Sequence, residues 1–63
     1  MTSEEFHFYS LAWSDLIKGA KIKHLRSAIK MYISMEDYEA CIGIQIAINE
    51  YIYYIDIKKK LLK

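Results

Sequence analysis

The stretch CIGIQIAINEYIYYIDI, residues 41–57, decides the fold, because its pattern fits both a strand and a helix. Isoleucine occupies every second position from Ile42 to Ile48, and a period of two is typical of a β-strand. Beyond Ile48 the apolar residues move to odd positions. A strand would therefore need a bulge or turn near Asn49, where there is neither glycine nor proline. A strand over Ile42–Ile48 remains the alternative to a helix.

Wrapped at 100° per residue, the same stretch forms two apolar stripes on opposite faces of a helix. The inner stripe contains Cys41, Ile44, Ile48, Tyr51, Ile52 and Ile55. The outer stripe contains Ile42, Ile46, Tyr53 and Ile57. Alternate isoleucines fall on opposite faces, which explains the period of two. The pattern predicts a helix over 36–59, with three lysines at 58–60 suited to its negative C-terminal end.

The start of the chain predicts a first helix over 3–18. Thr2 and Glu5 have the spacing of a capping box, in which each side chain bonds the other residue's backbone N–H. Gly19 suits the left-handed conformation that often ends a helix. The expected inward stripe is Phe6, Tyr9, Trp13, Leu16 and Ala20, widened by Ala12 and Ile17.

The segment AKIKHLRSAIKMYIS predicts a second, amphipathic helix over 20–33. Its outward face carries Lys23, Arg26 and Lys30. Ser34 is expected to cap the third helix. Two short connections between three helices favour antiparallel neighbours. The sequence therefore predicts an all-α, three-helix, hairpin-like bundle with residues 1–63 in a single domain.

A bundle of this size is only marginally stable alone, and disulfides, metals or partner chains usually help. A chain of about 60 residues buries only about 60% of the surface that its unfolded form exposes. Its single cysteine, Cys41, excludes an intrachain disulfide and fits a reducing, cytoplasmic setting. One stripe of the third helix can pack on the other two helices, which leaves the outer stripe uncovered. We therefore expect a homodimer through the third helix, with interface residues Ile42, Ile46, Tyr53, Ile57, Gly43 and Ala47.

Charge leaves one alternative function open. Nine basic and eight acidic residues give a net charge of +1, which does not favour polyanion binding overall. The segment KGAKIKHLRSAIK, however, has five bases and no acid. Lys23, Arg26 and Lys30 could contact the phosphates of a nucleic acid, or form an ordinary solvated helix face. Weak nucleic-acid binding is thus the alternative to protein interaction.

No pattern of catalytic, metal-binding or cofactor-binding residues is found in the sequence. His7, His24 and Cys41 lie in three different segments without metal-ligand spacing, and no phosphate-binding or nucleophile motif occurs. Gln45, Asn49, Glu50 and Asp56 interrupt the apolar run, so no membrane span is expected. The acidic start MTSEEFHFYS does not resemble a secretory signal. These features predict a non-enzymatic, cytoplasmic protein without a cofactor.

The length of the chain and the run MTSEEFHFYSLAWSDLIKGAKIKHLRSAIK, residues 1–30, resemble small early-region proteins of lambdoid bacteriophages. These proteins are encoded by short reading frames between the exonuclease and excisionase genes. The resemblance rests on no motif of known chemistry and brings no catalytic or ligand residues with it. It implies an accessory factor, made early in infection in the bacterial cytoplasm. Such a factor would modulate host physiology or the lytic-versus-lysogenic choice, with a host or phage protein as a further partner.

Overall fold

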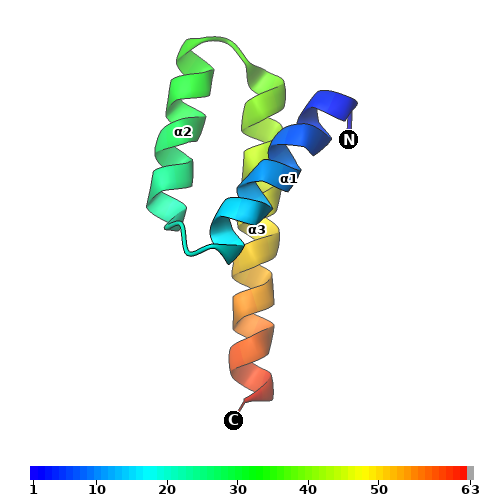
Figure 1. Cartoon of the computed structure of the whole chain (residues 1–63), viewed down its shortest axis with the longest axis vertical. Coiled ribbons are helices and arrows are strands. Elements are labelled where there is room, and N and C mark those ends of the chain that lie inside the picture. Colours follow the sequence, from blue (N-terminus) through cyan, green and yellow to red (C-terminus); the bar gives the residue numbers. More distant parts are fainter. Residues whose placement is uncertain (63) are drawn as a thin grey trace.

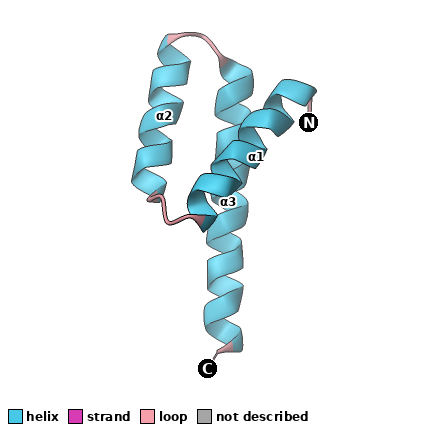
Figure 2. Cartoon of the chain, viewed as in Figure 1, coloured by secondary structure: helices cyan, strands magenta, loops and turns pink. Residues whose placement is uncertain are grey.

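The computed structural model describes residues 1–62, and these form three helices (Figures 1 and 2). They are α1 (Ser3–Ile17), α2 (Ile22–Ser34) and α3 (Tyr38–Leu61). The predicted all-α, three-helix fold is confirmed. The predicted boundaries are each within two residues of the observed ones, and no strand occurs among the described residues.

The ends of α1 form as the sequence predicts. Thr2 accepts from the backbone N–H of Glu5, and the Glu5 side chain accepts from the backbone N–H of Thr2. This reciprocal capping box satisfies two N–H groups that the helix leaves unpaired. Gly19 follows the helix with φ +106°, a conformation that other residues rarely adopt. The chain can therefore reverse within four residues to begin α2.

The start of α3 differs from the prediction. Asp37, not Ser34, caps the helix by accepting from the backbone N–H of Ala40 at 3.3 Å. The Ser34 hydroxyl instead donates to the carbonyl of Met31, in the last turn of α2. Glu36 has φ +59° and takes the left-handed position that turns the chain between the two helices. The predicted Ser34 cap was wrong because the turn at residues 35–37 was taken as part of the third helix.

Figure 1 shows α1 crossing the first half of α3, with α2 beside α3 and running in the opposite direction. Both α1 and α2 pack on α3, and α1 does so more extensively. The buried core consists of Ala12, Leu16, Leu25, Ile44, Ala47 and Ile48. Beyond α1 and α2, the second half of α3 continues as a projecting helix (Figure 1). The molecule is consequently elongated, with extents of 43 × 22 × 16 Å.

The inward face of α1 is rotated from the predicted one. Phe6 and Ile17 were expected inside but are 55% and 75% exposed. Phe8, which is not on the predicted stripe, packs against the core and meets Tyr32 of α2 edge-on at 5.3 Å. The cause is that α1 has neighbours in two directions, α3 and α2. Its buried arc lies between them and not on a single stripe.

Candidate functional site

The candidate interaction surface is the outer face of α3, defined by Ile42, Ile46, Tyr53 and Ile57. Ile42 is 44% exposed, Tyr53 68% and Ile57 37%, while Ile46 is half-buried. Ile44 and Ile48, which point the other way, are almost fully buried under α1 and α2. The structure thus places two apolar faces on α3, as the two-stripe pattern predicts. Residues 1–62 cover the inner face more fully than the outer one.

Two of the predicted interface residues lie elsewhere. Gly43 and Ala47 are buried within the chain, not on the outer face. A Cβ on Gly43 would lie 2.9 Å from the backbone nitrogen of Tyr9 and closer still to the carbonyl oxygen of Glu5. Gly43 and Ala47 are small, and the close helix approach that they allow therefore occurs between α3 and α1. Gly43 and Ala47 position α1 and are not available to a second chain.

Glu50 holds α1 at the border of the outer face. Its Oε1 accepts from the hydroxyl of Tyr9 at 2.5 Å and from the indole N–H of Trp13 at 3.2 Å. The hydrogen bond to Glu50 raises the pKa of Tyr9, and partial burial and the charge of Glu50 add to the effect. Trp13 also packs edge-on against Tyr51 at 5.8 Å. No local sequence pattern predicts this Glu50 clamp, because Glu50 lies 37 and 41 positions from its two partners.

Polar groups lie along the edge of the outer face. Gln45 Nε2 donates to Asn49 Oδ1 at 2.9 Å, and Asn49 lies beside the apolar row, at a height between Ile46 and Tyr53 along the helix. Near the C-terminal end, Lys60 pairs with Asp56 at 3.3 Å, with both side chains well exposed. An exposed ion pair of this kind contributes only about 0.2–1 kcal/mol to stability. Either residue can therefore leave it for another ion pair at little cost.

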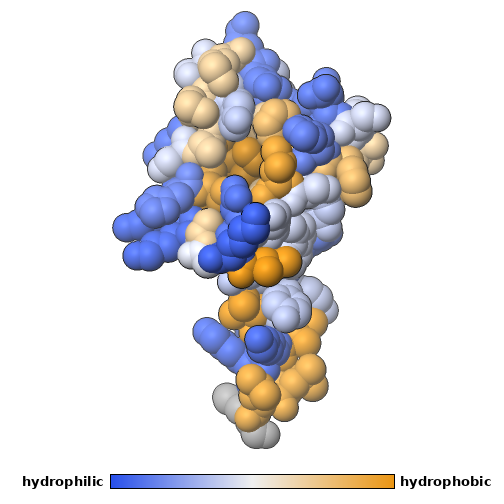
Figure 3. All heavy atoms as spheres, in the orientation of Figure 1, coloured by the Kyte–Doolittle hydropathy of each residue, from blue (hydrophilic) through white to orange (hydrophobic). Residues whose placement is uncertain are grey.

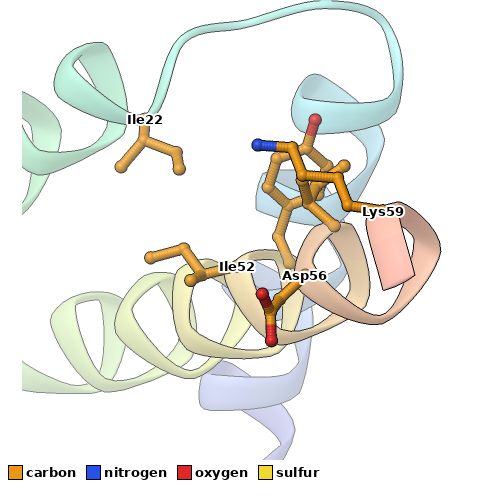
Figure 4. Close-up of a pocket in the computed structure, with 6 residues that line it drawn as sticks. Ile22, Ile52, Asp56 and Lys59 are labelled. Carbon is orange, nitrogen blue, oxygen red and sulfur yellow. The ribbon is translucent and has the colours of Figure 1, made fainter. Parts of the chain in front are cut away.

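The projecting half of α3 is apolar on more than the outer face. Ile52 is 43% exposed and Leu61 and Leu62 are 79% and 77% exposed, and Figure 3 shows apolar residues gathered on this part of the molecule. A shallow groove lies where α3 leaves the bundle. In Figure 4, Ile22 and Ile52 point toward one another across it, and Asp56 and Lys59 line its other end. Ile52 was predicted to be inside, but α2 is too short to cover it.

The basic row of α2 lies in solvent. Lys23, Arg26 and Lys30 are all exposed, at spacings that place them along one side of the helix. Among residues 1–62, none of the three is within ion-pair distance of an acidic group. The positive charges of the row are therefore not neutralised, as a phosphate-binding surface requires. An ordinary solvated helix face has the same property.

Side chains with metal-binding or nucleophilic chemistry are not brought together. His7 and His24 are exposed, and Cys41 is half-buried with its thiol 3.5 Å from the carbonyl oxygen of Ile29. No group of three or more histidine, cysteine, aspartate or glutamate side chains that could hold a metal occurs within the described part of the chain. None of the three described helices combines the length and apolarity needed to cross a membrane.

Comparison with known proteins does not assign a family or a function to this surface. No protein-family model, curated protein or solved structure matches the chain.

Proposed function

We propose that the protein is a small interaction factor that works as a homodimer through the outer face of α3. The observation that carries the proposal is a row of large apolar side chains, three of them exposed, on the side of the longest helix away from the buried Ile44 and Ile48. Contiguous apolar patches on small soluble proteins mark interaction surfaces. Aromatic residues such as Tyr53 are enriched in such surfaces.

The size of the exposed surface supports the same proposal. A compact monomer of this mass is expected to expose roughly 4,200 Å². The chain exposes 4741 Å². Its radius of gyration is 12.3 Å, against about 10.6 Å for a compact chain of this length. The projecting half of α3 contributes to this excess, since Ile52, Tyr53 and Leu61 are exposed there. A second copy would cover them.

The test of the dimer is sedimentation equilibrium on three proteins. Wild type is expected at twice the chain mass of 7.5 kDa at micromolar concentration. Tyr53→Glu should be a folded monomer, because Tyr53 is mostly exposed and its loss removes little packing within the chain. Ile17→Glu is the matched control, since Ile17 is 75% exposed, against 68% for Tyr53, but belongs to α1 and not to the outer face. It should remain a dimer. A folded wild type that stays monomeric at high micromolar concentration would overturn the proposal.

The role of such a dimer is that of a non-enzymatic regulatory factor. The supporting observations are the apolar surface and the resemblance of residues 1–30 to phage early-region proteins. In that setting the dimer would act in the cytoplasm of an infected bacterium, on host physiology or on the lytic-versus-lysogenic choice. Its further partner would be a host or phage protein, which binds surfaces that the dimer leaves free.

A second candidate function is weak nucleic-acid binding by α2, supported by the exposed and unneutralised row of Lys23, Arg26 and Lys30. Phosphate contacts make affinity fall steeply with salt. Titration of generic duplex DNA at several salt concentrations tests this candidate. Micromolar binding at physiological salt that is lost when the three charges are reversed would favour it over protein interaction. Binding that is absent, or unchanged by the reversals, would exclude it.

A further inference from the structure

The outer face of α3 has a symmetry that specifies how a second copy would lie on it. Ile42 and Ile57 stand at equal distances from a point between Asn49 and Glu50, and so do Ile46 and Tyr53. The helix therefore presents nearly the same order of apolar side chains when read from either end. A two-fold dimer of antiparallel helices requires this self-complementary order.

Charged side chains are also placed symmetrically about this point, but the charge at one end is opposite to the charge at the other. Glu39 and Lys60 are equidistant from it, at opposite ends of the outer face. Glu39 is exposed and accepts from the Thr2 hydroxyl, and Lys60 is exposed beside Asp56. Acidic residues cluster at the start of α3 and three lysines lie in its last turn. In a parallel dimer each charged cluster would lie beside the same cluster of the second copy, and the like charges would repel. In an antiparallel pair each acidic cluster meets the lysines of the other copy.

A polar side chain lies at the edge of the face, level with its midpoint. Asn49 lies between the two apolar pairs, and its Oδ1 already accepts from Gln45, which leaves its amide N–H groups free to donate. Near a two-fold axis, Asn49 would face its own copy. A polar residue within a helical seam is a known means of fixing register, because any shift leaves it opposite an apolar side chain. The pattern thus selects one register among those that would bury the isoleucines.

Resting on the proposed dimer, we infer that the second copy lies antiparallel along α3 with the two-fold axis between Asn49 and Glu50. Ile42 then packs against Ile57 of the second copy, and Ile46 against Tyr53. Glu39 pairs with Lys60 at each end of the seam. From residue 39 to residue 60 this seam is about 32 Å long, at 1.5 Å per residue. α1 lies along one border of this face, where Thr2 bonds Glu39 and both Tyr9 and Trp13 bond Glu50. Ile42, Tyr53 and Ile57 are exposed on the face, and Ile46 is half-buried.

The area available is sufficient for a specific dimer. Interfaces at the lower end of the standard size bury about 600 Å² on each partner. That is roughly an eighth of the 4741 Å² that the chain exposes. Four large apolar side chains and their neighbours along six turns of helix can supply such an area. Covering the face would also bury part of the projecting half of α3.

The register is tested by distances between spin labels on single cysteines, in a Cys41→Ser background. Lys60→Cys and Asp56→Cys place labels at exposed positions where packing within the chain is not disturbed. In the antiparallel register the two copies of the label are about 20 Å apart at position 56 and about 32 Å apart at position 60. A parallel dimer would instead keep both pairs within about 10 Å, the spacing of packed helices.

Each outcome decides a different question. Distances that increase from position 56 to position 60 as stated support the antiparallel register. In a protein of twice the chain mass, two other outcomes would overturn the register: short distances at both positions, or long distances without this increase. The proposal of a dimer would still stand. The absence of any distance between copies, together with the mass of a monomer, would overturn the proposed function itself.

Discussion

Replacing Gly43 by alanine is expected to lower the thermal midpoint by about 10 °C or more. The added Cβ would lie within 3 Å of backbone atoms of α1, where no side-chain rotation can relieve the contact. Forcing an extra carbon into a packed site costs about 1–3 kcal/mol, and a clash between backbones belongs at the upper end. The better helix propensity of alanine returns about 1 kcal/mol. The net loss of about 2 kcal/mol is large for a chain of this length, whose stability is about 3–9 kcal/mol.

Circular dichroism during heating measures this change, and Gln45→Ala is the control. Gln45 is exposed on the same helix and two residues away, so its replacement should shift the midpoint only slightly. A Gly43→Ala protein that is as stable as the control would show that α1 does not cross α3 at this point. The assignment of Gly43 to the interior would then be wrong.

Ile48→Ala is expected to leave the protein largely unfolded at room temperature. Ile48 is fully buried, in the core that α3 forms with α1 and α2. Truncation of such a side chain costs about 2–5 kcal/mol, because the cavity only partly closes. This cost is comparable to the whole stability expected for 63 residues.

Urea denaturation followed by circular dichroism measures the loss, with Ile17→Ala as the matched control. Ile17 is 75% exposed at the end of α1, and its truncation should cost little. If the two variants were equally stable, the division of α3 into a buried and an outer face would be wrong.

The helices could be predicted from local features of the sequence. Thr2 with Glu5 and Gly19 each act within a few residues, and they form the cap and the turn that their spacing predicts. The two stripes of α3 likewise follow from the helical period alone. Such features need no knowledge of how the helices are arranged in space.

The arrangement of the helices was not predictable in the same way. Gly43 and Ala47 lie between the two stripes, so the helical period assigns them to neither face. Their burial follows from the crossing of α1, whose backbone can come close only where side chains are small. The Glu50 clamp depends on the same crossing. Ile52 and Ile17 lie at the margins of the helix contacts and stay exposed, which the periodicity does not reveal.

The central claim is that a second copy covers the outer face of α3, and NOEs between isotopically labelled and unlabelled copies test it most directly. Along one helix, Ile46 and Tyr53 are about 10 Å apart, too far for a strong NOE. We predict cross-peaks between the Ile46 methyl groups of one copy and the Tyr53 ring of the other. A mixed sample at millimolar concentration that gives no cross-peak between copies from any outer-face residue would contradict the claim.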